Sequence, residues 1–277
     1  MTTHRGQVSR RNAMLGAVGL AAGAAAANVA ASLPASAKAP MSGPGATAYR
    51  RVKLGGFEVT TVFDGYANIP KVHPIFGQNQ SAEAVGSYMQ ENHLPANAMQ
   101  IGFTPVIVNT GNELVLFDSG NGSSRGPTRG HLLKSLAAAG YSPDQIDILV
   151  ITHYHPDHIG GLITDGKPTF PNARYVTGEA ENNFWTSKKV TESTDKKMIG
   201  RSKLVQAQVV PLAAKTSFIK GGKDVVTGIT AIDAFGHTPG HTAYNIESSG
   251  KRLLLWGDAC NHYVASLQKP EWHVIFD

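Results

Sequence analysis

The sequence contains a single cysteine, Cys260, among its 277 residues. One cysteine cannot form an intramolecular disulfide, so the chain is not a disulfide-stapled scaffold and has to rely on a hydrophobic core. Its length is sufficient to bury such a core in one large domain. We interpret Cys260 as a small buried apolar residue, with a catalytic thiol as the alternative.

Charged residues are scarce as well, at 16% of the chain against 42% hydrophobic residues, which excludes the disordered class. The net charge is +5, but Arg5, Arg10 and Arg11 lie in the first 37 residues, which contain no acidic residue, so +5 − 3 = +2 remains for the rest. No run of Lys and Arg interleaved with aromatic residues follows. We therefore expect no nucleic-acid partner.

The N-terminus has the composition of an export signal. Arg10-Arg11 precede an Ala- and Gly-rich apolar stretch over about 14–31, and Ala35-Ser36-Ala37 provides small residues for a signal peptidase. The paired arginines resemble a twin-arginine signal. The sequence thus predicts an export signal over 1–37, a flexible leader over 38–48 rich in Pro, Gly, Ser and Ala, and a periplasmic or secreted protein.

Two alternatives to this route stay open. Ala13 stands where twin-arginine signals usually carry a bulky apolar residue, which leaves ordinary secretion or a membrane anchor. The apolar stretch is too rich in Ala and Gly for a good transmembrane span. We expect no stable membrane insertion after the signal is removed.

Beyond the leader, apolar runs alternate with helical patterns, which predicts a layered α/β fold for residues 49–277. The expected elements are strands at 57–63, 145–152, 230–235 and 252–256, a hairpin of 104–109 with 113–117, helices at 127–139 and 179–185, and a solvated helix face or loop at 187–203.

A cluster of histidines follows the strand at 145–152. His153 and His155 are two positions apart, so at a strand end their side chains point the same way and can share one metal ion. Pro156 then turns the chain, and Asp157 and His158 can face a second ion. Packing these groups into a core without a ligand would be costly, so we interpret the cluster as a metal site.

Two later elements and one earlier one complete a recognisable order. HYHPDH at 153–158 is followed by GHTPGH at 236–241 and by an apolar run that ends in Gly257-Asp258, while Asp118-Ser119-Gly120 precedes the cluster. This combination resembles the metallo-β-lactamase superfamily over about residues 49–277. The resemblance implies a four-layer αββα sandwich, here expected to lack its C-terminal elements.

The resemblance also implies the roles of the site residues. One ion would be held by His153, His155 and His237, the other by Asp157 and His158, with Asp258 bridging both, and Asp157 and Asp258 would be the catalytic carboxylates. His241 and Asp118 would contact the ligands rather than the ions, although Asp118 has a turn-forming role as its alternative. The donor types favour two divalent ions, with Zn²⁺ first and Mn²⁺, Co²⁺ or Fe²⁺ as alternatives.

The implied chemistry is attack on a carbonyl carbon or a phosphorus atom by a hydroxide that bridges the two ions. Residues 49–60, 109–118 and 183–185 are similar to methyl parathion hydrolase and its lactonase-like relatives, which implies a small-molecule substrate: a lactone, an aryl ester or an organophosphate triester. Trp185 and Phe184 would line an apolar leaving-group pocket, with core packing as the alternative for Phe184. A homodimer is left open.

One departure from the family pattern generates the competing hypotheses. After Asp258 the chain offers only His262 and His273, whereas the family carries a further histidine on a later strand-end loop. We therefore expect an incomplete sequence and a weakly held second ion. The alternatives are a periplasmic metal-binding or degenerate non-catalytic member, or a β-lactamase.

Overall fold

The computed structural model describes residues 47–123 and 125–276. The expected export signal at 1–37 and all but the last two residues of the expected leader at 38–48 lie outside this range. Within the described ranges, none of the helices has the length and apolar character needed to cross a membrane.

The larger of the two main sheets has seven strands in the order β1-β2-β5-β6-β7-β10-β11, antiparallel through β6 and parallel from there on. Its strands are β1 (Tyr49–Leu54), β2 (Phe57–Val62), β5 (Val106–Asn109), β6 (Leu114–Phe117), β7 (Ile148–Ile151), β10 (Arg174–Gly178) and β11 (Thr216–Ile219). Every residue of β6 and β7 is buried, as expected for central strands covered on both faces.

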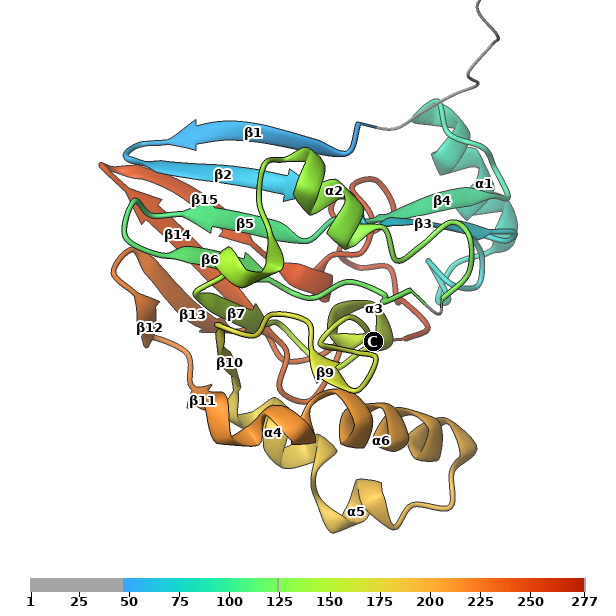
Figure 1. Cartoon of the computed structure of the whole chain (residues 1–277). Helices are drawn as coiled ribbons and strands as arrows, with labels where there is room; N and C mark the ends of the chain where they lie inside the picture. Colours follow the sequence, from blue (N-terminus) through green and yellow to red (C-terminus); the bar gives the residue numbers. More distant parts are fainter. Residues whose placement is uncertain (1–46, 124, 277) are drawn as a thin grey trace, which may run out of the picture. The chain divides into compact units, whose positions relative to one another are not determined.

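The smaller main sheet is antiparallel, in the order β12-β13-β14-β15. Its strands are β12 (Asp224–Val226), β13 (Ile229–Asp233), β14 (Thr242–Ser248) and β15 (Lys251–Leu255). One apolar cluster joins the two sheets face to face, and in it the rings of Phe117 and Tyr244 lie 5.2 Å apart. Figure 1 shows the two sheets packed against each other. This sandwich is the core that carries the site.

Helices pack on the outer face of the seven-stranded sheet. A second apolar cluster joins β6 and β7 to α2 (Leu132–Ala138), α4 (Glu179–Trp185), α5 (Lys188–Thr191) and α6 (Lys196–Gln208). The outer face of the smaller sheet instead exposes Ile232, at 40%. The α/β sandwich expected from the resemblance is therefore confirmed, with three of its four layers seen among the described residues.

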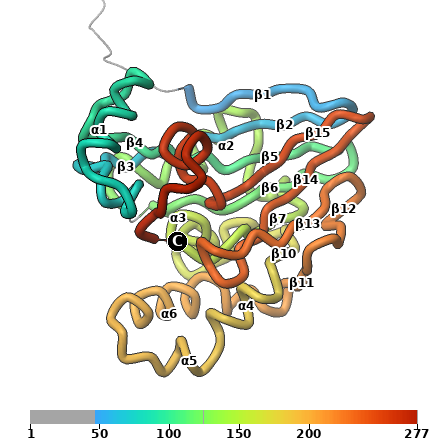
Figure 2. Tube along the Cα trace, turned by 180° about the vertical axis from the view of Figure 1, so that it is seen from behind, coloured from blue at the N-terminus to red at the C-terminus, as the bar shows by residue number. Residues whose placement is uncertain are grey.

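A third apolar cluster lies beside the sandwich. It joins α1 (Ala82–Glu91) and the hairpin of β3 (Gly65–Ile69) and β4 (Met99–Phe103) to residues 264–276. Figure 2 shows the C-terminal segment beside α1. An early and a late segment of the described chain thus meet in this cluster. The remaining elements are short: α3 (Pro156–Ile159), β8 (Ile163–Thr164), β9 (Lys167–Pro168) and three 3₁₀ turns, η1 (Pro143–Gln145), η2 (Val210–Lys215) and η3 (Gly257–Ala259).

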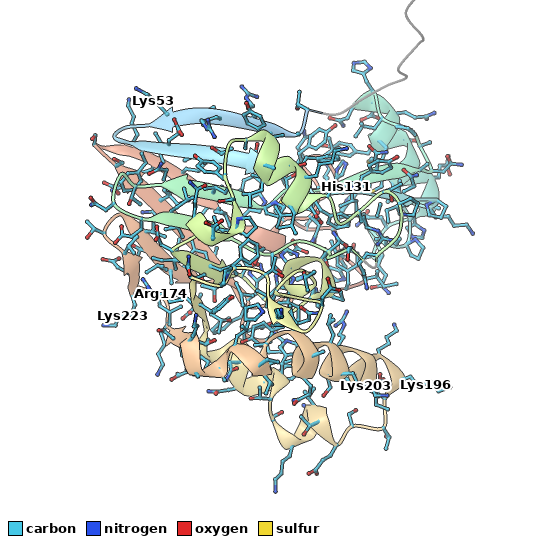
Figure 3. The ribbon with its side chains drawn as sticks, in the orientation of Figure 1. Lys53, His131, Arg174, Lys196, Lys203 and Lys223 are labelled. Atoms are coloured by element: carbon cyan, nitrogen blue, oxygen red, sulfur yellow. The ribbon has the colours of Figure 1, made fainter. Side chains whose placement is uncertain are left out.

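The hairpin and the helix at 179–185 are confirmed, and the other expected strands are present with slightly different bounds. One expectation was wrong. The helix expected at 127–139 begins only at Leu132, because Gly130 has a φ value of 79°. The solvated helix face or loop expected at 187–203 is present as two helices, α5 and α6, joined by residues 192–195. α6 extends beyond the expected segment to Gln208, and Asp195 caps its start by accepting bonds from two backbone amides. Its exposed lysines, Lys196 and Lys203 among them, are seen in Figure 3.

Candidate metal centre

The HYHPDH segment leaves the buried strand β7 and turns at once into α3. Pro156 occupies the first helical position, where its missing amide hydrogen costs nothing. Gly160 closes the turn, and a Cβ there would lie 2.2 Å from the carbonyl oxygen of Asn121, so only glycine allows this approach. The turn holds His153 and His155 in the interior, 0% and 6% exposed.

Four side chains form a first donor set: His153, His155, His237 and Asp258. The Nε2 atom of His237 lies 2.8 Å from His155 Nδ1 and 3.3 Å from Asp258 Oδ2. The Nε2 atom of His153 lies 3.8 Å from the same carboxylate oxygen. The set joins the loop after β7 to the loop before β14, so both sheets contribute to it.

Three side chains form a second donor set next to the first: Asp157, His158 and Asp258. His158 Nε2 lies 3.4 Å from Asp157 Oδ2 and 3.4 Å from Asp258 Oδ1. Asp258 belongs to both sets, and its two oxygens divide between them, with Oδ2 facing the first and Oδ1 the second. The structure therefore brings together all six residues that the sequence predicted as ligands.

Asp118 contacts His158 directly and His153 through Thr152. Its Oδ2 accepts a hydrogen bond from His158 Nδ1 at 2.9 Å, and its Oδ1 accepts one from the backbone amide of Thr152 at 2.8 Å. The hydroxyl of Thr152 lies 3.0 Å from His153 Nδ1 and donates to Asp118. With both Nδ1 atoms donating to these partners, the Nε2 lone pairs point into the donor sets.

His241 contacts Asp258 through the backbone. Its Nε2 accepts the amide hydrogen of Asp258 at 2.9 Å, while its Nδ1 donates to the carbonyl oxygen of Ala234 at 3.1 Å. Gly257 permits this contact, because a Cβ there would lie 2.6 Å from His241 Nε2. His241 thus lies behind Asp258 and orients it.

The electrostatics separate His158 from His153, His155 and His241. Burial lowers the pKa of His153 well below its usual value, that of His155 to about 3 and that of His241 to about 4. Burial also acts on His158, but the nearby carboxylates, Asp258 first, outweigh it and raise its pKa. Without a metal, His158 is the cation of the cluster.

The charge of His158 in turn affects the pKa values of two carboxylates, Asp157 and Asp258. Burial opposes ionisation of Asp157 and Asp258, but the charge of His158 and its hydrogen bonds outweigh burial and lower both pKa values. The site therefore combines the neutral imidazoles of His153 and His155 with the ionised carboxylates of Asp157 and Asp258. Such mixed nitrogen and oxygen donors suit Zn²⁺ and similar divalent ions.

One buried atom tests this fit directly. His153 Nε2 is enclosed in the first set and has no hydrogen-bond partner among the described residues. A buried polar atom without a partner is destabilising unless something binds it. A divalent ion in the first set supplies that partner, so the residues fit the group that the sequence predicted.

The donor sets border a cavity of about 700 Å³. One wall is apolar, drawn from the β3–β4 hairpin, from the end of β15 and from the C-terminal segment: Ile69, Ile101, Phe103, Leu254, Trp256 and Phe276. Arg125 and Arg201 also line it. Arg201 has its guanidinium 5.8 Å from the centre of the Trp185 ring. The cavity therefore combines apolar surface with positive charge beside the donor sets.

The predicted pocket residues Trp185 and Phe184 need correcting, because neither is among the residues that line this cavity. Trp185 is 1% exposed and packs in the core, with its ring 6.5 Å from that of His155. Phe184 packs edge-on against Trp185 and the same core. The apolar face of α4 points inward, so this pair supports the histidines from behind.

The later histidines lie outside both donor sets. His262 uses its Nδ1 to accept the backbone amides of Val264 and Ala265, and His273 is exposed. Cys260 is partly buried at the cavity, and burial raises the pKa of its thiol, which fits the apolar interpretation better than the catalytic one.

Sequence reasoning missed Glu181 and Arg201. Glu181 is fully buried behind the donor sets, and Arg201 reaches the cavity from α6. Glu181 lies in a segment predicted as a helix and Arg201 in one predicted as a solvated helix face or loop, and their partners are far away in the sequence. Only the charge of Glu181 at the start of an expected helix was visible, and that is a common feature of helices.

Comparison with known proteins agrees with this geometry. The family model described as the metallo-beta-lactamase superfamily matches residues 104–260. The solved structure of the hydrolase AbOPH, of the beta lactamase superfamily, is similar at 28% identity and a TM-score of 0.76, covering 84% of this chain and 81% of that one. AidC, a dizinc quorum-quenching lactonase solved with the product N-hexanoyl-L-homoserine, is similar at 27% identity and a TM-score of 0.66, covering 74% and 72%.

A probable metal-dependent hydrolase from Staphylococcus aureus shares the fold at 21% identity and a TM-score of 0.60, covering 75% and 74%. A comparison with curated proteins finds no match. The family match spans more than half of the chain and includes both histidine motifs and Asp258. The chain belongs to the metallo-β-lactamase superfamily.

Proposed function

We propose that this chain is a hydrolase of small neutral esters that works with two divalent ions, with lactones as the first substrate class and aryl esters and organophosphate triesters as the alternatives. The observation that carries this proposal is the division of the Asp258 oxygens between two donor sets at the wall of a partly apolar cavity. His153, His155 and His237 would hold one ion, Asp157 and His158 the other, with Asp258 between them.

Two divalent ions at such a site make water more acidic and polarise the bond to be cleaved. The residues of the chain do the rest. Leu254, Trp256 and Phe276 offer apolar surface to the acyl or aryl part of a substrate. Arg201 offers a positive charge to the anion that hydrolysis of a neutral ester creates.

Two observations support the preference for lactones: the lining of the cavity and the product bound in a solved relative. Opening an N-acylated lactone yields one molecule that carries a carboxylate, a hydroxyl group and the acyl chain, and the cavity offers both a cation and apolar surface. The solved structure of AidC holds a product of this kind. A substrate with an acyl chain and a lactone ring therefore suits the cavity.

The test is an assay of the full chain, stripped of metal and reloaded with Zn²⁺, Mn²⁺ or Co²⁺. We expect turnover of N-hexanoyl-homoserine lactone, with the aryl ester and aryl phosphotriester slower, and no turnover by the stripped protein. A protein that binds two ions but hydrolyses none of the three supports the non-catalytic alternative, and turnover of a penicillin or carbapenem alone supports the β-lactamase.

We also propose that the protein works outside the cytoplasm. The arginine pair Arg10-Arg11 before an apolar stretch supports this. Fractionation of a bacterial host that expresses the full chain tests it, with Arg10→Lys/Arg11→Lys as the control that blocks twin-arginine export. Equal cytoplasmic retention of both proteins contradicts the proposal.

A further inference from the structure

Glu181 is a buried carboxylate that accepts four hydrogen bonds. It lies in the first turn of α4 and is 0% exposed. Its Oε1 accepts the backbone amide of Tyr154 at 2.7 Å and Trp185 Nε1 at 2.8 Å. Its Oε2 accepts the hydroxyl of Thr238 at 2.7 Å and the backbone amide of Gly240 at 3.0 Å. Each oxygen is therefore saturated by two donors.

Three of these four donors belong to the two loops that carry the histidines of the first donor set, and the fourth, Trp185, lies on α4 itself. Tyr154 lies between His153 and His155 in the loop after β7. Thr238 and Gly240 follow His237 in the loop before β14. The loops come from different sheets, and Glu181 is bonded to both at once. One carboxylate thus connects the backbone around His155 to the backbone around His237.

The start of α4 and the loop before β14 approach each other so closely that glycine is required on both sides of the contact. A Cβ on Gly240 would lie 1.9 Å from the backbone nitrogen of Glu181, and one on Gly178 would lie 2.6 Å from Thr242 Oγ1. Only glycine at these positions lets the start of α4 meet the loop before β14. The pairing of Glu181 with this loop is therefore tightly packed.

We propose that Glu181 is a positioning residue that sets the distance between His155 and His237, and thereby the affinity and geometry of the first metal ion. The inference depends on the proposed function only in that an ion binds there. A buried carboxylate needs several donors to offset its lost hydration, and here all four come from the two loops or from the helix that carries it. Trp185, which was expected to line the pocket, instead donates one of these four hydrogen bonds to Glu181.

Glu181→Gln is the direct test, because glutamine keeps the shape but replaces one oxygen by an NH₂ group. Wherever that group lies, it faces a backbone amide that can only donate. We expect the affinity for Co²⁺, measured by competition with a chromophoric chelator, to fall about 10- to 100-fold. The visible absorption of the bound Co²⁺ should shift, since it reports the geometry of the ligands.

Two further variants each remove a single hydrogen bond to Glu181, so that the size of the effect on metal binding can be compared. Thr238→Val removes one donor to Oε2 and keeps the volume, while Trp185→Phe removes one donor to Oε1 but replaces a buried indole by a smaller ring. Each should weaken Co²⁺ binding less than Glu181→Gln and in the same direction. Tyr175→Phe is the matched control, because it removes a buried hydroxyl that donates to Phe170 at 3.0 Å in the same core, away from both loops.

The outcomes separate three cases. Weaker Co²⁺ binding and a shifted spectrum in the Glu181 and Thr238 variants, with wild-type values in Tyr175→Phe, support the proposal. Wild-type affinity and spectrum in Glu181→Gln and Thr238→Val overturn it, even if both proteins melt at lower temperature. If Glu181→Gln does not fold, Thr238→Val and Trp185→Phe decide in the same way. Failure of the wild-type protein to bind Co²⁺ counts against the proposed function instead.

Discussion

His155 Nδ1 and His237 Nε2 lie 2.8 Å apart, although 82 positions separate the two residues. One residue follows β7 in the larger sheet, and the other precedes β14 in the smaller sheet. Two nitrogen atoms at this distance need a proton or a cation between them. The pair is therefore a sensitive place to test whether the donor set holds metal.

Replacing His237 should remove the first ion. In His237→Ala we expect metal affinity to fall by more than about 100-fold, the upper end of the effect of residues that only support a ligand. Hydrolysis should fall with it. Competition titration and metal analysis after dialysis give the measurement, and His273→Ala is the control because His273 is an exposed histidine outside the donor sets. Equal metal content in both variants contradicts the assignment.

Replacing Asp118 should affect the second ion. Asp118→Asn keeps the shape but turns the 2.9 Å charge-assisted bond to His158 Nδ1 into a neutral one. We expect affinity for the second ion to fall about 10- to 100-fold, so that protein dialysed at low metal retains one ion where the wild type retains two. Metal analysis of both proteins checks this. Retention of two ions by the variant would show that Asp118 acts only through the turn that it forms.

The metal-free protein should lose stability as the pH falls from 6.5 to 4.5. His153, His155 and His241 have lowered pKa values in the fold, so below the ordinary value near 6.5 the unfolded chain binds more protons than the folded one. The free energy of unfolding then falls with pH, by about 1.4 kcal/mol per pH unit for one such histidine and by about 4 for all three.

Two other groups also act in this window. Burial raises the pKa of Glu181, so this group opposes the loss of stability, whereas burial lowers the pKa of His262, which adds to it. His158, whose pKa is raised, is protonated in both states below pH 6.5, and its stabilisation is lost only as the pH rises through its raised pKa. The lowered carboxylates act only below about pH 4. Urea unfolding of stripped protein measures the slope, and His241→Gln should reduce it by the contribution of one histidine. A free energy independent of pH contradicts the prediction.

Replacing Arg201 should weaken binding of the anionic product. In Arg201→Met we expect inhibition by N-hexanoyl-homoserine to weaken about tenfold, since a hydrogen bond to a charged group contributes about 1.5 kcal/mol or more. The product inhibition constant is the measurement. Lys203→Met is the control, because Lys203 is an exposed cation on the same helix, α6, and does not line the cavity of Arg201 (Figure 3). Equal weakening in both variants would indicate a general effect of charge.

Four of the six candidate ligands could be predicted because local rules place them. His153 and His155 share a strand end, and Asp157 and His158 follow its turn, so the sequence alone brings them together. His237 and Asp258 needed the order of motifs along the chain. Glu181 could not be predicted, since its partners Tyr154 and Thr238 lie 27 and 57 positions away and no periodic pattern links them.

The walls of the cavity were less predictable for a related reason. The β3–β4 hairpin and residues 264–276 meet only through a separate apolar cluster, so no single stretch of sequence describes that wall. Trp185 has the composition of a pocket residue, but the face of α4 that carries it turns toward the core. An aromatic residue in a helix does not reveal which side it faces until its neighbours are known.

The histidines of the first donor set come from loops of both sheets, and this has a consequence for the stability of the fold. The chain has one thiol and cannot form an internal disulfide, but an ion bound by His153, His155 and His237 would connect the larger sheet to the smaller one. Like a disulfide, it would close a long loop of chain, and its binding free energy would add to the stability of the sandwich. Removal of the ion by a chelator should then weaken the contact between the two sheets.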